Sequence, residues 1–101
     1  MAKVSAVQKN DKRIKLSDRF FKRRLALKKI IMDKKISLED RFKAQQKLSN
    51  LPKNSAKNRV MNRCQITGRP HGVYRKLKIS RIALRDLGLH GLIPGMTKSS
   101  W

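Results

Sequence analysis

The chain has 101 residues, enough for one small domain at most, and it carries 27 Lys and Arg against six Asp and Glu, a formal net charge of +21. Three Phe, one Tyr and one Trp allow only a thin core, and the single cysteine excludes an internal disulfide. Repulsion among so many cations opposes compaction, so the composition predicts a polyanionic partner, with nucleic acid as the first candidate and a membrane surface as its rival.

The first dozen residues are polar except for Val4 and Val7, and we expect a loose basic arm there. The opening MAKVSAVQKNDKR lacks the apolar core of a signal peptide, and no apolar run has the length that a bilayer crossing needs, so we expect a soluble intracellular protein. From about Asn10 to Met32 the hydrophobic residues recur at helical spacing, which predicts an amphipathic helix. Its apolar stripe consists of Leu16, Phe20, Leu27 and Ile31, widened by Phe21, Leu25 and Ile30.

A second helix is predicted after a turn at residues 33–36. Ser37 is typical of an N-cap, Glu39 and Asp40 favour the positive end of the helix dipole, and Pro52 should end the helix. We expect the two helices to pair as an antiparallel hairpin because each alone is marginally stable, with all three Phe side chains packed rather than stacked on bases. The second helix is expected to turn four side chains inward: Leu38, Phe42, Leu48 and Leu51.

The segment 53–63 has little periodicity and predicts an extended basic connector between the N-terminal arm and hairpin, residues 1–52, and a C-terminal unit, residues 64–101. No acidic residue occurs between Asp40 and Asp86, while Lys and Arg recur every few residues. Cations spaced in this way suit a path along a phosphate backbone.

The only cysteine begins a pattern with the spacing of a zinc ribbon, C-x2-C-x12-C-x2-C. From Cys64 the remaining ligand positions are Thr67, Ser80 and Ala83, none of which replaces a thiolate. His71 and His90 lie at irregular spacing and do not complete a tetrahedral site, so we expect no metal and no other cofactor.

The same stretch offers little for catalysis. A Cys–His pair needs an orienting third group and a pocket that excludes water, and the nearest acid after Cys64 is Asp86. The chain shows no paired carboxylates and no phosphate-cradling loop. We therefore expect a buried or inert thiol that is a remnant of a lost site, and a protein that is not an enzyme and has no small-molecule substrate.

The C-terminal unit is predicted to be a degenerate zinc-ribbon-like loop followed by a short helix and an extended tail. Turns are expected around Gly68, Pro70 and Gly72, and a short strand from Val73 to Leu77. Ser80 is expected to cap a third helix that ends near residue 88, where glycines begin to break the chain. The overall expectation is a small, mainly α, extended protein.

The candidate RNA-binding residues are the cations and aromatic side chains of the connector and the C-terminal unit. His71 and Tyr74 are suited to stacking on unpaired bases, although Tyr74 is equally suited to packing on the third helix. Trp101 either stacks on RNA or packs on a neighbouring protein. The full set is Lys53, Lys57, Arg59, Arg63, Arg69, His71, Tyr74, Arg75, Lys76, Lys78, Arg81, Arg85, Lys98 and Trp101.

Several of these stretches together resemble a known family. NRC-x2-TGRP, VYRK, SRIALRDL, G-x-IPG and the terminal KSSW are similar to bacterial small-subunit ribosomal protein fourteen over residues 59–101. The first half, through SLEDR and LPKNSAKNR, resembles only the longer bacterial and organellar form. The short form of that family keeps four cysteines and binds zinc, whereas the long form has lost them.

The resemblance implies a place in the head of the small ribosomal subunit, in a bacterial cytoplasm or a mitochondrial matrix. The implied partners are the three-prime domain of the small-subunit rRNA and ribosomal proteins three, ten and nineteen, with no membrane. It also implies a part in head assembly and in shaping the RNA near the aminoacyl-tRNA site. One departure from the family pattern is Leu77-Lys78-Ile79, where many relatives have Phe-Gly-Leu or Phe-Gly-Ile, so the local turn geometry is in question.

Two other classes of protein fit part of the pattern. A generic basic DNA- or nucleoid-binding protein fits the charge, but the chain has no helix-turn-helix signature, no basic-zipper heptads and no intact zinc finger. A membrane-active protein fits the cationic amphipathic pattern of residues 12–31, but it leaves the glycine-rich second half unexplained.

Overall fold

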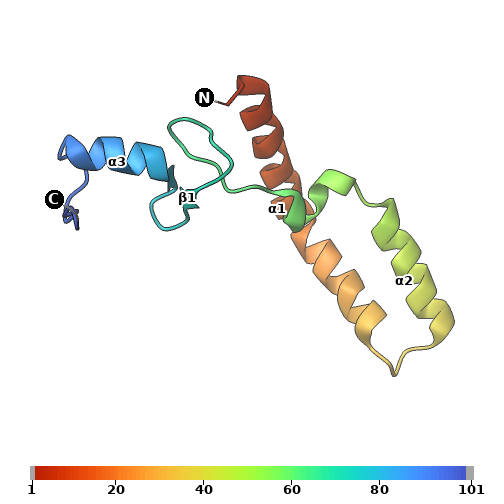
Figure 1. The fold of residues 1–101 in the computed structure, drawn as a ribbon. Helices are drawn as coiled ribbons and strands as arrows, with labels where there is room; N and C mark the ends of the chain where they lie inside the picture. The colour runs from red at the N-terminus through yellow and green to blue at the C-terminus, as the bar shows by residue number, and fades with distance from the viewer. Residues whose placement is uncertain (1, 100–101) are drawn as a thin grey trace. The chain divides into compact units, whose positions relative to one another are not determined.

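The computed structural model describes residues 2–99, which form three α-helices, two single-turn 3-10 helices and one two-stranded sheet (Figure 1). The elements in chain order are α1 (Val4–Met32), α2 (Leu38–Asn50), η1 (Lys53–Ser55), η2 (Lys57–Arg59), β1 (Val73–Tyr74), β2 (Ile79–Ser80) and α3 (Arg81–Leu89). They belong to two compact units. We call residues 8–60 the hairpin unit, and residues 2–7 with 61–99 the ribbon unit. The predicted mainly helical class is confirmed.

Helix α1 begins earlier than the sequence suggested, so the prediction of a loose arm is wrong from Val4 onward. The carbonyl of Lys3 already accepts hydrogen bonds from the N–H groups of Ala6 (3.1 Å) and Val7 (3.3 Å). No Gly or Pro interrupts the chain from Val4 to Met32. Since each residue added to an existing helix contributes one further hydrogen bond, polar residues are sufficient to extend it.

In the hairpin unit, α1 and α2 run in opposite directions on either side of a short turn (Figure 1). Ser37 caps α2 as predicted, because its Oγ accepts a hydrogen bond from the Asp40 N–H (3.5 Å) and donates one to the Asp40 carboxylate (3.0 Å). Near the turn, Arg41 Nε donates to the carbonyl of Ile31 (2.9 Å). Helix α2 ends at Asn50, two residues before Pro52, as expected.

The inward face of α2 differs from the predicted one. Leu38 and Phe42 were expected inside but are 78% and 64% exposed, while Ala44 is buried and Leu48 is half-buried. The buried side of the helix is centred on Ala44 and Leu48, and the bond from Arg41 to α1 holds this side inward. Phe42 is two residues from Ala44 and therefore points to the opposite side of the helix. The expectation that every Phe is packed is likewise wrong for Phe42 and for Phe21, which is 49% exposed.

The segment after α2 was expected to be extended but contains η1 and η2, which are separated by the extended residue Ala56. Pro52 has its φ fixed by its ring, and its carbonyl accepts from both the N–H (3.0 Å) and the hydroxyl of Ser55. This closes a tight turn that local sequence periodicity does not reveal. Ser55 is only 1% exposed, so the turn is held firmly within the hairpin unit.

The ribbon unit contains a small apolar core under a β-hairpin. Strand β1 pairs antiparallel with β2, with Val73 opposite Ser80 and Tyr74 opposite Ile79. The buried residues are Cys64, Ile79 and Ala83, with Val73, Leu84, Leu87 and Ile93 packed against them. The predicted strand is shorter than expected, since β1 ends at Tyr74 and the chain turns at residues 75–78.

Helix α3 is capped as predicted, and Ser80 Oγ accepts a hydrogen bond from the Ala83 N–H (3.2 Å). The helix ends at Leu89, one residue beyond the expected end. Within residues 2–99, every helix lacks the combination of length and apolarity that crossing a bilayer requires.

Candidate nucleic-acid interface

The four positions of the degenerate ribbon lie together around one sulfur atom. Cys64 and Ala83 share the buried core, and the Thr67 N–H donates to Cys64 Sγ (3.4 Å). The backbone N–H of Ser80 also points to this sulfur. In the part of the chain that the structure describes, no three His, Cys, Asp or Glu side chains gather in one place. We call residues 64–69 with Ser80 and Ala83, which surround this single sulfur atom, the knuckle.

Hydrogen bonds govern the electrostatics of this thiol. Burial raises the pKa of Cys64, but hydrogen bonds from Thr67, Ser80 and Ile66 outweigh it and lower the pKa from 9.0 to about 6. The backbone N–H groups supply part of this effect, together with the Thr67 hydroxyl, which lies beside the sulfur without a hydrogen bond of standard geometry. The side chain is only 3% exposed, so the sulfur is a structural hydrogen-bond acceptor rather than an accessible nucleophile.

Hydrogen bonds within the chain close the loop at residues 64–69. The N–H of Cys64 donates to the Arg69 carbonyl (3.0 Å), and the Gly68 N–H donates to the Cys64 carbonyl (2.9 Å). Arg63 Nη1 donates to the Gly68 carbonyl (2.8 Å). The Ala2 N–H donates to the Thr67 carbonyl (3.2 Å), so the start of the described chain is fastened to this loop.

A groove of about 420 Å³ in the ribbon unit brings together four of the predicted RNA-binding residues. Arg81 and Arg85 line it from α3, Tyr74 from β1 and Lys98 from the tail. Tyr74 is 51% exposed, so about half of its surface is accessible to a ligand. Among residues 2–99, no Asp or Glu lines the groove, so the site combines positive charge with an exposed aromatic ring, as sites for unpaired nucleotides do.

The other predicted residues of the ribbon unit lie outside this groove. Arg75, Lys76 and Lys78 are exposed on the turn between the strands, and His71 is exposed nearby in sequence. Two predicted arginines have structural bonds of their own. Arg69 Nε donates to the His71 carbonyl (3.0 Å), and Arg63 is engaged with Gly68. Trp101 lies outside the described residues.

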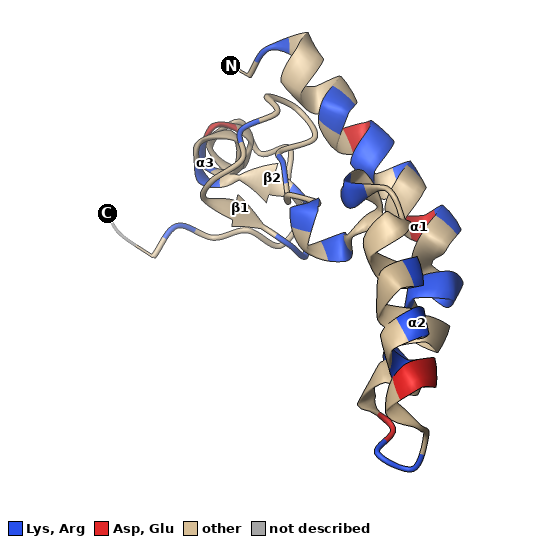
Figure 2. Ribbon diagram, turned by 90° about the vertical axis from the view of Figure 1, so that its right-hand side faces the viewer, with Lys and Arg blue, Asp and Glu red and all other residues tan. Residues whose placement is uncertain are grey.

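In the hairpin unit, Lys53, Lys57 and Arg59 are exposed on the 3-10 turns, as a phosphate-binding role requires. Arg59 Nη1 donates to Asn54 Oδ1 (3.4 Å), which orients its guanidinium. Figure 2 shows Lys and Arg distributed along α1, α2 and the 3-10 turns, whereas Asp and Glu occupy few positions. The positive charge of the hairpin unit is thus spread over several elements and is not confined to one segment.

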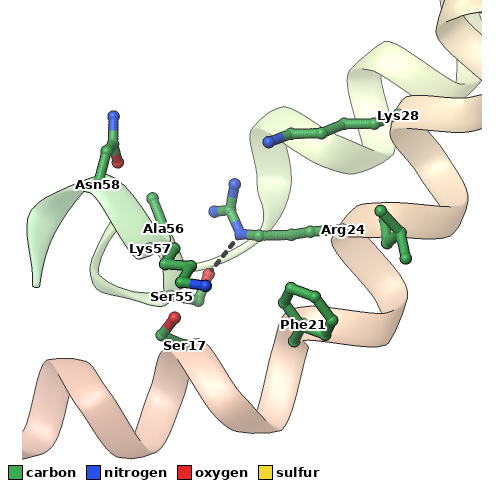
Figure 3. Close-up of a pocket in the computed structure, with 9 residues that line it drawn as sticks. Ser17, Phe21, Arg24, Lys28, Ser55, Ala56, Lys57 and Asn58 are labelled. Atoms are coloured by element: carbon green, nitrogen blue, oxygen red, sulfur yellow. Dashed lines mark hydrogen bonds between the residues drawn. The ribbon is translucent and has the colours of Figure 1, made fainter.

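A second groove, of about 510 Å³, lies between α1 and the 3-10 turns and was not predicted from the sequence (Figure 3). Phe21, Arg24 and Lys28 project into it from α1, and Lys57 faces them with its Nζ 5.8 Å from the centre of the Phe21 ring. A signal was present, because residues 21, 24, 25 and 28 share one helical face on which two cations interrupt the apolar stripe. Cations on the apolar side of an amphipathic helix indicate that this face does not pack wholly in the hydrophobic core.

Comparisons with known proteins identify the family of the chain. The family described as "Ribosomal protein S14p/S29e" matches residues 47–100. The chain is 92% identical to the "Small ribosomal subunit protein uS14" of Pelagibacter ubique (strain HTCC1062), over the whole length of both chains. The proteins of the same name from Bartonella quintana (strain Toulouse) and Chelativorans sp. (strain BNC1) are 62% and 60% identical, again over both whole chains. The chain therefore belongs to the ribosomal protein S14p/S29e family, in its bacterial type.

Proposed function

We propose that this protein is a structural constituent of the small ribosomal subunit and binds the three-prime domain of the subunit's RNA in the head. The observation that carries the ribosomal role is the 92% identity, along the whole chain, to a protein named as part of the small ribosomal subunit. The finer assignment to the head comes from the resemblance of the C-terminal motifs, and the acid-free grooves support RNA as the ligand.

The proposed mechanism is electrostatic positioning with a smaller contribution from stacking. Lys and Arg side chains of both units neutralise phosphates and release counterions, while Tyr74 and His71 offer exposed rings to unpaired bases. In the ribbon unit, the rigid knuckle around Cys64 orients α3 and so sets the positions of Arg81 and Arg85. The protein acts by holding RNA in place and not by chemistry.

The proposed neighbours in the head are ribosomal proteins three, ten and nineteen. We also propose that the protein supports assembly of the head and shapes the RNA near the aminoacyl-tRNA site. The relatives named above are bacterial, which favours a bacterial ribosome over a mitochondrial one. The exposed Leu38 and Phe42 on α2 are suited to protein contacts within such an assembly.

Sedimentation of a native lysate through a sucrose gradient after a high-salt wash tests this proposal. Salt strips proteins that are held only by non-specific charge, so a ribosomal constituent is expected to remain with small subunits. Movement of the protein into bulk nucleic acid would favour the DNA- or nucleoid-binding alternative. Movement into membranes would favour the amphipathic alternative, and either result would remove the ribosomal role.

A further inference from the structure

The groove between α1 and the 3-10 turns has a rigid floor. Ser17 of α1 and Ser55 of η1 are 6% and 1% exposed, so the two segments approach closely there. Arg24 closes one side by donating from Nε to Ser55 Oγ (2.9 Å) and from Nη2 to the Pro52 carbonyl (3.0 Å). These bonds connect residues about thirty positions apart and hold the groove in shape without a ligand.

The open part of the groove, unlike its floor, presents an exposed aromatic ring and ammonium groups. Phe21 is 49% exposed, and the Lys57 ammonium lies near its ring. Lys28 extends from α1 toward the same space (Figure 3). The rest of the lining consists of the Arg24 guanidinium and of small, polar and apolar residues, and among residues 2–99 it includes no Asp or Glu. A half-exposed aromatic ring with the Lys57 ammonium beside it, in a groove that Lys28 also lines, matches a ligand that is both flat and negatively charged.

The volume of about 510 Å³ lies within the range of about 300–1,000 Å³ typical of sites for small ligands. We propose that this groove binds one unpaired nucleotide of the small-subunit RNA, with its base stacked on Phe21 and its phosphate between Lys28 and Lys57. The inference rests on the proposed function, because it assigns a second RNA site to the hairpin unit in addition to the groove of the ribbon unit.

The test uses the full chain and a transcript of the three-prime domain of the small-subunit RNA. Phe21→Leu keeps an apolar side chain but removes the ring, whereas Phe21→Tyr keeps the ring. We expect Phe21→Leu to weaken binding about tenfold, as loss of one base–aromatic stack does, and Phe21→Tyr to bind within about twofold of the wild type. Because Phe21 is half-exposed, neither change should unfold the helix, which far-UV circular dichroism checks.

The lysines provide a second, independent measurement. Lys28→Gln with Lys57→Gln is compared with Lys43→Gln with Lys47→Gln, which removes two exposed cations of α2 that do not line the groove. The groove pair should reduce the salt dependence of binding more than the α2 pair, because its two ammonium groups face the proposed phosphate. Only the groove pair should increase the chemical reactivity of a single unpaired nucleotide, and this should be the same nucleotide that Phe21→Leu exposes.

The outcomes separate this inference from the proposed function. If the wild-type chain fails to bind the transcript, the RNA-binding function itself is wrong. If the wild type binds and Phe21→Leu binds equally well, with no nucleotide changed in reactivity, the groove is not an RNA site although the protein is an RNA binder. If Phe21→Leu binds the transcript normally but leaves assembled subunits, the occupant is a protein, and the inference is also overturned.

Discussion

Lys78 is the only non-glycine residue with a positive φ among residues 2–99, and its φ is +57°. It ends the turn between β1 and β2, where its N–H donates to the Tyr74 carbonyl (2.7 Å). The turn at Leu77-Lys78-Ile79 therefore has a left-handed backbone at Lys78, although glycine is absent. A side chain in this conformation costs roughly 1–2 kcal/mol.

Lys78→Gly is expected to stabilise the ribbon unit by about 0.5–1 kcal/mol. Relief of the left-handed strain outweighs the roughly 0.5–1 kcal/mol that glycine loses in conformational entropy. Lys78→Ala is the matched control, because it removes the same charge and keeps the strain. Thermal melting of the two variants measures the difference. Equal melting temperatures would show that the turn is relaxed with a side chain present.

The Cys64 thiol predicts a pH dependence of stability. Its pKa is lower in the folded chain than in the unfolded one, so the unfolded chain binds more protons between about pH 6 and pH 9. Stability should therefore rise with pH across this window, by up to about 1.4 kcal/mol per pH unit, and this gain is lost as the pH falls through about 6. Denaturant unfolding at several pH values measures the slope.

Cys64→Ala is the control for this prediction, because it removes the titrating group and keeps a small buried side chain. The difference in stability between wild type and variant should grow from pH 6 to pH 9. Two parallel profiles would mean that the thiol stays protonated in the folded chain.

At the scale of elements, the ribbon loop depends on contact with the first residues of the described chain. Gly68 has a φ of +76°, and a Cβ built there would lie 2.9 Å from Val7 Cγ2 and 3.1 Å from Ala2 Cβ. Val7 belongs to α1, so the beginning of this helix packs directly on the loop. This contact and the hydrogen bonds of the loop fix the position of the loop beside the start of α1.

Gly68→Ala is expected to destabilise the ribbon unit by about 1–3 kcal/mol, because the new methyl group clashes with Val7 in a backbone conformation that alanine adopts poorly. Gly88→Ala is the matched control. Gly88 lies within α3 with nothing within 4 Å of a new Cβ, so alanine should stabilise the helix by up to about 1 kcal/mol. Chemical denaturation measures the free energy of unfolding of both variants. The prediction requires this free energy to fall for Gly68→Ala and to rise for Gly88→Ala.

The elements that could be predicted from sequence are those governed by local interactions. Ser37 and Ser80 cap their helices as expected, because a cap bonds to groups three residues away. The inward face of α2 could not be predicted, because Leu38 and Phe42 are as apolar as Leu48 and only the packing against α1 selects among them. The same holds for the groove at Phe21, which exists only because η1 folds back onto α1.

At the scale of the whole molecule, the charge of +21 dominates, and the structure divides the cations into two classes. Some have structural partners, as Arg24, Arg41 and Arg63 do through bonds to backbone carbonyls. Others, such as Arg85, are exposed and line a groove without a hydrogen bond of their own. The first class supports the fold, and the second class is available to phosphates.

This division predicts opposite behaviour for two arginines that the sequence treats alike. Arg85→Gln should leave the melting temperature unchanged and should reduce the slope of log K against log salt concentration for RNA binding by about 0.7–0.9, the contribution of one neutralised phosphate. Arg63→Gln should lower the melting temperature, because the bond to the Gly68 carbonyl is lost and the loop around Cys64 loosens. Titrations of the three-prime-domain transcript at several salt concentrations, with melting curves of the same samples, measure both effects. If Arg85→Gln lowered the melting temperature and left the salt slope intact, the cations of α3 would serve the fold, and the groove beside them would not be a phosphate site.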